Sequence, residues 1–228
     1  MRTHYICGMK LNTVIFDMDG LLIDSEPLWK EAADSLLLNY GRKLTVQQYA
    51  ITTGLRTKEF LQHWFTHFDL PAAELAAAER MIVEEVIRLV KQKGKAMAGV
   101  AHIINFFSER NFKIGLATSS APALISVVVD LLGIGSYLQA ISSADELAFG
   151  KPHPKVYLNC AQKLSVLPSE CICFEDSFNG MIAAKAARMK CIIVPSLHDA
   201  KNPAWDAADL KISTLSNFNE LLLQSLEK

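Results

Sequence analysis

The sequence predicts an α/β protein in which a parallel sheet carries helices on both faces and a helical module is inserted after the first strand. Short apolar runs alternate with helical patterns along most of the chain, and this alternation is typical of strand–helix–strand units. The runs are apolar throughout rather than at every second residue, as expected for strands that are buried on both faces. Residues 27–97, in contrast, show helical patterns and no convincing strand.

The core elements are expected in alternating order. Strands are expected at residues 13–16, 113–117, 140–142, 172–174, 191–194 and 210–212. Helices are expected at residues 100–108, 123–132, 154–163, 178–187 and 218–226. Gly133 follows one of these helical runs and is typical of a helix C-cap. Pro154 suits the first turn of the helix that it opens.

The inserted module begins where the alternation of strands and helices stops. Its helices are expected at residues 28–38, 46–51, 57–66 and 71–91. The last of them is rich in Ala, Glu and Leu, which favour helices. Residues 94–99, with a glycine at each end, are the expected hinge back into the core. We therefore expect a core of residues 11–26 and 98–228, an inserted module of residues 27–97 that can move as a lid, and a frayed N-terminal extension of residues 1–10.

Composition and charge exclude several classes of protein. The 228 residues are 50% hydrophobic and 21% charged, which is typical of a globular protein. The net charge of −1 predicts no nucleic-acid partner, and no apolar run reaches the roughly 18 residues of a membrane span. The first ten residues also lack the apolar stretch of a signal peptide.

The five cysteines do not form a recognisable metal motif. Their number is odd, and Cys171 and Cys173 have only one residue between them, whereas zinc ligands are usually spaced more widely. We interpret the cysteines as small buried hydrophobic residues. Free thiols of this kind predict a protein of the reducing cytoplasm.

Two carboxylates, Asp17 and Asp19, follow the apolar run 14–16 directly. Ionised carboxylates at the end of a buried strand are unfavourable unless a metal, a cation or hydrogen-bond donors compensate them. Residues two apart on a strand point to the same side, and Gly20 permits a turn. Both acids can therefore face the crevice beyond the strand, where open α/β sheets bind ligands. The competing interpretation is that they cap the following helix or pair with surface lysines.

Three more polar clusters follow other predicted strands. They are Thr118-Ser119-Ser120, Lys151 in Gly-Lys-Pro-His-Pro, and Glu175-Asp176-Ser177. Each alone has an ordinary explanation as turn hydroxyls, a solvated lysine or acids at a helix N-terminus. Together they supply the parts of a magnesium site, a nucleophile, phosphate donors and a cation.

These four motifs, in this order, resemble those of the haloacid dehalogenase superfamily of phosphotransferases. The matching residues are Asp17-Met18-Asp19-Gly20, Thr118, Lys151, and Glu175-Asp176-Ser177 with Gly180. The resemblance covers residues 12 to about 194 and implies a Rossmann-like core with a small inserted helical cap. Residues 21–27 resemble the branch that holds β-phosphoglucomutases, 2-deoxyglucose-6-phosphate and hexitol-phosphate phosphatases, and nucleotide-type phosphatases.

The resemblance implies a role for each motif. Asp17 would be the nucleophile and Asp19 the acid–base, while Thr118 would hydrogen-bond a phosphoryl oxygen and Lys151 would offset negative charge. The implied cofactor is Mg²⁺, and its implied ligands are Asp17, the backbone carbonyl of Asp19, Asp176, and Glu175 either directly or through water.

Four further residues are expected to contact the substrate. Gly54 and Arg56 resemble the cap loop that inspects the substrate, with Arg56 reaching a polar leaving group. Ser119 and Ser120 are candidate phosphate donors. A solvated arginine and two helix-start serines are the plain alternatives.

The resemblance therefore implies magnesium-dependent hydrolysis of small phosphomonoesters, namely sugar or sugar-alcohol phosphates, through an aspartyl-phosphate. A mutase of the β-phosphoglucomutase type is the alternative, but a histidine typical of that enzyme is replaced by Trp29. A catalytically dead binding module is disfavoured because both acids of the first motif are present. A true haloacid dehalogenase is also disfavoured, because members with that activity lack the second acid, here Asp19. The expected partner is a small phosphorylated metabolite, which the sequence does not name, and the expected state is a monomer.

Overall fold

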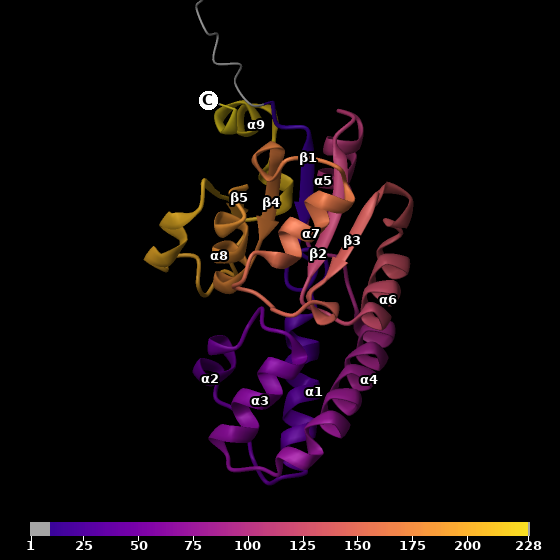
Figure 1. Ribbon diagram of the computed structural model, residues 1–228, viewed down its shortest axis with the longest axis vertical. Helices are drawn as coiled ribbons and strands as arrows, with labels where there is room; N and C mark the ends of the chain where they lie inside the picture. The colour runs from indigo at the N-terminus through magenta and orange to yellow at the C-terminus, as the bar shows by residue number, and fades with distance from the viewer. Residues whose placement is uncertain (1–9, 228) are drawn as a thin grey trace, which may run out of the picture.

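A six-stranded parallel sheet forms the centre of the core in the computed structural model, which describes residues 10–227 (Figure 1). Its strands are β1 (Thr13–Phe16), β2 (Lys113–Thr118), β3 (Ala140–Ser143), β4 (Cys171–Glu175), β5 (Lys190–Ile193) and β6 (Leu210–Lys211). Their spatial order is β3-β2-β1-β4-β5-β6, and every neighbouring pair is parallel. The predicted sheet is confirmed, with each strand end within one residue of its expected place.

Helices cover both faces of this sheet (Figure 1). They are α5 (Val100–Ser108), α6 (Pro122–Leu132), α7 (Lys155–Lys163), α8 (Phe178–Ala186) and α9 (Glu220–Leu226). Val14 and Phe16 of β1 belong to a hydrophobic cluster that includes side chains of α5 and α9. Ile15, between them, belongs to a second cluster that includes side chains of α7 and α8. Because neighbouring residues of a strand point to opposite faces, this division explains why the strand is apolar at every position.

The inserted module contains helices near the predicted positions, but the first begins two residues earlier and the last four residues later than expected. They are α1 (Glu26–Leu38), α2 (Val46–Ile51), α3 (Thr57–His67) and α4 (Leu75–Lys93), with a short 3-10 turn, Ala72–Glu74, before the last. The helix α4 packs against α1 and α3 in the cap and then runs back beside α6 of the core (Figure 1). The exact module boundaries, 26/27 and 97/98, stay a prediction.

Capping explains where several helix ends differ from expectation. Gly133 is confirmed as the C-cap of α6, with a φ of 64°. Pro154 is the N-cap of α7 rather than a residue of its first turn. The helix α9 begins at Glu220 instead of 218, because the Asn219 side chain accepts a hydrogen bond from the Leu222 N–H and so caps the helix at that point.

The cysteines of the described part of the chain behave as expected. Cys160, Cys171, Cys173 and Cys191 are all buried and free. Cys7 lies outside the described residues, as does the predicted frayed extension apart from Lys10.

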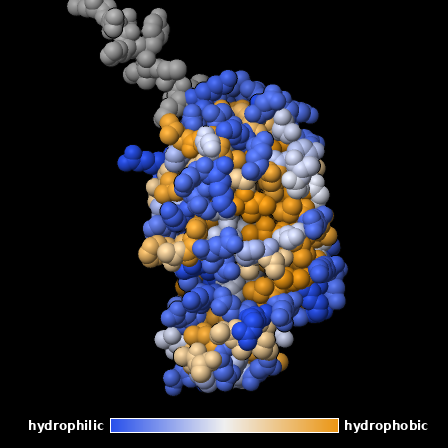
Figure 2. Space-filling view, turned by 45° about the vertical axis from the view of Figure 1, so that its right-hand side comes forward, coloured by the Kyte–Doolittle hydropathy of each residue, from blue (hydrophilic) through white to orange (hydrophobic). Residues whose placement is uncertain are grey.

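The surface of the described residues is hydrophilic over most of the face in Figure 2, with hydrophobic side chains gathered in its middle. The helices α4 and α6, which pack against each other, expose Met81 and Leu131. None of the helices between residues 10 and 227 is long and apolar enough to cross a membrane. The expected monomeric state stays a prediction.

Candidate active site

The four predicted motifs meet at one edge of the sheet. Phe16 of β1 pairs with Leu116 of β2 and Phe174 of β4, so the residues that follow them lie together at the carboxyl ends of three strands. The next two strands of the chain, β2 and β3, lie on one side of β1, and the later strands lie on its other side. Open α/β sheets bind ligands where the strand order reverses direction in this way. A cavity that is open to solvent lies between this edge and the cap. The predicted site residues that line it are Asp17, Asp19, Gly54, Thr118, Ser119, Ser120, Lys151 and Asp176.

Lys151 is a buried cation between two carboxylates. Its Nζ donates hydrogen bonds to Oδ1 of Asp17 at 2.5 Å and to Oε1 of Glu175 at 2.6 Å, and its side chain is 2% exposed. Burial alone would lower the pKa of Lys151, but the two carboxylates more than offset this effect and raise the pKa above its usual value. The lysine is therefore charged at any physiological pH.

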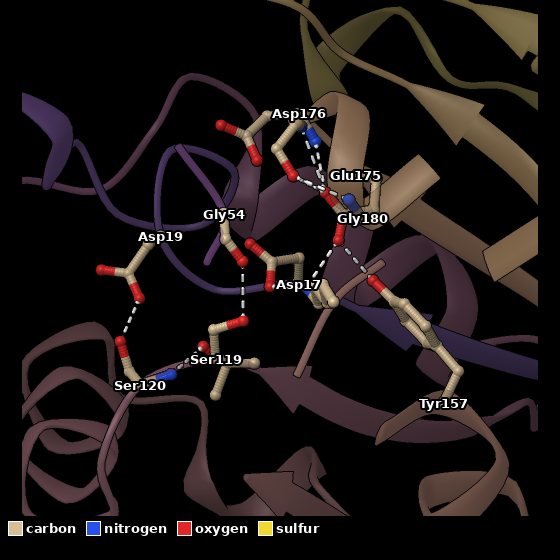
Figure 3. Close-up of polar contacts among 12 residues, drawn as sticks. Asp17, Asp19, Gly54, Ser119, Ser120, Tyr157, Glu175, Asp176 and Gly180 are labelled. Atoms are coloured by element: carbon tan, nitrogen blue, oxygen red, sulfur yellow. Dashed lines mark hydrogen bonds and ion pairs between the residues drawn. The ribbon is translucent and has the colours of Figure 1, made fainter. Parts of the chain in front are cut away.

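Glu175 is fully buried, and the protein occupies both of its carboxylate oxygens (Figure 3). Besides the lysine ammonium, Oε1 accepts a hydrogen bond from the Tyr157 hydroxyl at 2.5 Å. Oε2 accepts from the N–H groups of Asp176 and Ser177 and from the Ser177 hydroxyl, each at 3.1 Å. A Cβ built at Gly180 would overlap this carboxylate, so glycine is required there. Glu175 thus fixes the lysine and the start of α8, and it does not line the cavity.

Three acids of the site are close enough to hold a metal ion. Asp17, Glu175 and Asp176 each offer a carboxylate oxygen, and these oxygens lie within 4.8 Å of one another. Burial raises the pKa of Asp17 to about 8, with Glu175 adding to this rise and Lys151 opposing it. Burial and the charges of Glu175 and Asp17 also raise the pKa of Asp176 well above its usual value. An all-oxygen donor set with excess negative charge fits a hard divalent cation such as Mg²⁺.

These raised pKa values predict how the stability of the metal-free protein depends on pH. Folding raises the pKa of Asp17 from its usual value of 3.8 to about 8. The folded protein therefore holds protons that the unfolded chain has released, and its stability falls as the pH rises through this window. Mg²⁺ takes the place of these protons. It is therefore expected to raise the Tm more at pH 8 than at a pH closer to 3.8.

Thermal unfolding with chelator and with Mg²⁺ at both pH values measures this difference. Comparing the two additions at one pH cancels the effects of titratable groups elsewhere. The variant Asp176→Asn is expected to lose most of the Mg²⁺ effect. An equal Tm increase at both pH values in the unmodified protein would contradict the interpretation.

Asp19 lies apart from this acidic group and is held by three donors. Its Oδ1 accepts hydrogen bonds from the Ser25 hydroxyl at 2.6 Å and from Nε1 of Trp29 at 2.9 Å. Its Oδ2 accepts from the Ser120 hydroxyl at 2.6 Å (Figure 3). The carboxylate is thus oriented from α1 on one side and from the loop after β2 on the other, while it still borders the same cavity as Asp17.

The hydroxyls at the end of β2 and just after it already make contacts within the protein. Thr118 is 1% exposed, and its Oγ1 accepts a hydrogen bond from the N–H of Ser120. The Ser119 hydroxyl donates to the carbonyl of Gly54 at 2.8 Å and so joins core and cap (Figure 3). Of the two serines that were expected to contact phosphate, one therefore contacts the cap and the other contacts Asp19.

Gly54 is required by its backbone and by its surroundings. Its φ of 81° favours glycine, and a Cβ there would crowd the Ser177 hydroxyl. The preceding residue, Thr53, accepts a hydrogen bond at its carbonyl from Nδ2 of Asn179 at 3.0 Å. The loop is thus tied to the start of α8 as well as to the segment after β2.

Arg56 differs from expectation, because its guanidinium binds the core instead of entering the cavity. Its Nη1 donates to the carbonyls of Leu147 at 2.8 Å and Ala144 at 3.3 Å, and Nη2 donates to Glu59 at 2.5 Å. A Cβ at Gly150 would crowd both the guanidinium and the Glu59 carboxylate. The arginine is therefore packed against the loop that leads to the buried lysine, and it does not line the cavity.

Three residues of the site were not singled out from the sequence for these contacts. They are Ser25, Trp29 and Tyr157. Trp29 replaces a histidine of the mutases, and its place one turn into the helix after the first motif also allows a contact with Asp19. Tyr157 offers no such signal, because its partner lies 18 residues away on another element.

Known proteins resemble this chain along most of its length. The family model of haloacid dehalogenase-like hydrolases matches residues 11–188. Hexitol phosphatase B of Escherichia coli K12 is 36% identical over 203 residues, which cover 89% of this chain and 91% of the relative. Phosphorylated carbohydrates phosphatase of Thermotoga maritima is 31% identical over 193 residues, with coverages of 84% and 89%. The crystal structure of β-phosphoglucomutase from Clostridium difficile has the same fold, with a TM-score of 0.85, coverages of 95% and 97%, and 22% identity.

Proposed function

Because the chain belongs to the haloacid dehalogenase-like hydrolase family, we propose that it hydrolyses small phosphomonoesters of sugars or sugar alcohols through a phosphorylated Asp17, with Mg²⁺ as its cofactor. Both curated relatives described above are phosphatases by name, and the chain covers most of their length. The observation that carries the proposal is the buried pair of Asp17 and Lys151, which lines the cavity between the core and the cap.

The reaction would proceed in two displacements at phosphorus. A carboxylate oxygen of Asp17 forms a bond to phosphorus, the bond to the leaving oxygen breaks, and that oxygen takes a proton from Asp19. A water then attacks the phosphorus and gives its proton to Asp19, and the bond to Asp17 breaks to release phosphate. Asp19 must be protonated in the first step and ionised in the second, which is the usual double role of an acid–base. Its three hydrogen-bond donors place it at the cavity, two residues from the nucleophile.

The remaining groups would stabilise charge. Lys151 holds the nucleophile in place and offsets negative charge as phosphorus is attacked, and Thr118 offers a hydroxyl to a phosphoryl oxygen. Asp17, Asp176 and the backbone carbonyl of Asp19 would hold Mg²⁺, which when bound offsets charge on the phosphoryl group. Since both oxygens of Glu175 are occupied, we propose that this residue reaches the metal only through water.

A substrate screen with and without metal tests this function. Release of inorganic phosphate is expected from p-nitrophenyl phosphate and from a panel of hexose and hexitol monophosphates. A chelator is expected to stop the release and Mg²⁺ to restore it. Activity that survives exhaustive chelation would contradict the metal assignment. Formation of glucose 6-phosphate from β-glucose 1-phosphate would favour the mutase alternative instead.

A further inference from the structure

The cap side of the cavity has the composition of a subsite for a polyol. The rings of Trp29 and Phe60 give it apolar walls, while Glu26, Tyr49 and Thr57 bring polar groups to its lining. Within the described part of the chain, none of these three polar side chains has a hydrogen-bond partner. Their polar atoms are also not fully buried, so solvent or a ligand can reach them. Apolar walls with a few free polar groups are typical of a site that binds the carbon faces and hydroxyls of a small ligand.

Charge is distributed unevenly over this cavity. Lys151 is the one Lys or Arg among the described residues that line it, and its ammonium forms ion pairs with Asp17 and Glu175. Arg56, which lies between the lining residues Leu55 and Thr57, donates its hydrogen bonds to core carbonyls and to Glu59 instead. Among the described cap residues that line the cavity, Glu26 is the acid and none is a Lys or Arg.

Glu26 of the cap lines the cavity and lies close to the acids of the core. It is half-buried at the start of α1, and a Cβ built at Gly20 would lie 3.5 Å from its Cγ. That glycine follows Asp19, and the same built Cβ would overlap the Asp176 carboxylate. The Glu26 side chain therefore lies close to Asp176 and lines the same cavity from the start of the cap helix α1.

We propose that this subsite selects the leaving group by charge, with Glu26 accepting a hydrogen bond from a hydroxyl of an uncharged polyol and repelling a second anionic group. This inference rests on the proposed function, because it names the leaving group at the same site. A monophosphate places its one anionic group beside Lys151 and the acids proposed to hold the metal. Its neutral end then lies beside Glu26. A bisphosphate places a second anion next to Glu26 and Asp19 without a cation to pair with it. An ammonium group on the sugar is attracted instead.

Charge variants of Glu26 test the proposal. The unmodified protein is expected to prefer a hexitol monophosphate over fructose 1,6-bisphosphate by about 100-fold in kcat/KM, the effect of one close unpaired charge in a partly buried site. The change Glu26→Gln is expected to raise the KM for the hexitol phosphate and to narrow this preference. The change Glu26→Lys is expected to narrow it further by lowering the KM for the bisphosphate. Glu84→Lys, an exposed position on α4, makes the same change in net charge and is expected to leave the preference as it is.

An amino sugar gives an independent readout of the same charge. Glucosamine 6-phosphate is expected to have a higher kcat/KM than glucose 6-phosphate, and Glu26→Gln is expected to remove that difference. Equal preference for mono- and bisphosphate, or a preference that Glu26→Lys does not change, would overturn charge selection while hydrolysis of p-nitrophenyl phosphate still supports the proposed function. Failure to hydrolyse any phosphomonoester would instead overturn the proposed function itself.

Discussion

Replacing Asp17 with Asn is expected to lower turnover of every phosphomonoester by at least about 1,000-fold, because an amide can neither attack phosphorus nor serve as an anionic metal ligand. The fold is expected to survive this change. Burial already favours the neutral form of Asp17, since it raises the pKa of this residue to about 8. A neutral amide of the same shape therefore removes one of three crowded carboxylates, and the Tm of the metal-free variant is expected not to fall at pH 8.

Steady-state kinetics and thermal unfolding of the same samples separate these two effects. The exposed Asp130 of α6 provides a matched control, because Asp130→Asn makes the same chemical change far from the motifs. That control is expected to keep both turnover and Tm. Turnover of Asp17→Asn at the level of the unmodified protein would show that another group is the nucleophile.

Replacing Lys151 with Met is expected to damage both activity and stability. The change leaves Asp17 and Glu175 buried without their shared cation. Breaking a buried ion pair in this way costs about 3–5 kcal/mol, which corresponds to a fall in Tm of roughly 10 °C for a chain of this size. Turnover is expected to fall by about 100-fold or more, because negative charge on the phosphoryl group is no longer offset.

The half-exposed pair of Lys185 and Asp209 supplies the control for this prediction. Its N–O distance of 2.6 Å resembles that of the buried pair, but the lysine is 35% exposed. Lys185→Met is therefore expected to cost no more than about 1 kcal/mol and to leave turnover unchanged. Lys151→Arg, which keeps the charge, is expected to be less destabilised than Lys151→Met. If the two methionine variants behave alike, the buried lysine does not have the role assigned to it.

The sheet and its motifs could be predicted because the information is local. Each strand is a short apolar run, and the polar residues that follow it lie at the sheet edge by the geometry of parallel strands. The order of strands around β1 then brings Asp17, Lys151 and Asp176 together, as the sequence led us to expect. Helix ends were less predictable, because a single capping side chain such as Asn219 moves a boundary by two residues.

Contacts between distant elements could not be predicted from sequence spacing. Nothing in the sequence shows that Arg56 meets carbonyls 88 and 91 residues away, and its charge alone favours the prediction of a contact with a polar leaving group. Likewise, Ser120 and Asp19 are 101 residues apart, and their hydrogen bond depends on how the loops after β1 and β2 pack. The sequence identifies the acids of the site, whereas the structure shows which donors hold each of them.

Trapping the phosphorylated side chain tests the central claim most directly. The protein is mixed with a hexitol phosphate and Mg²⁺, quenched in acid during turnover, and treated with borohydride, which reduces an acyl phosphate to an alcohol and leaves free carboxylates intact. Peptide mass spectrometry is expected to find this reduction at Asp17, and not in samples without substrate. Reduction at Asp19, Glu175 or Asp176, or none at any acid while turnover continues, would contradict the assignment of Asp17 as the nucleophile.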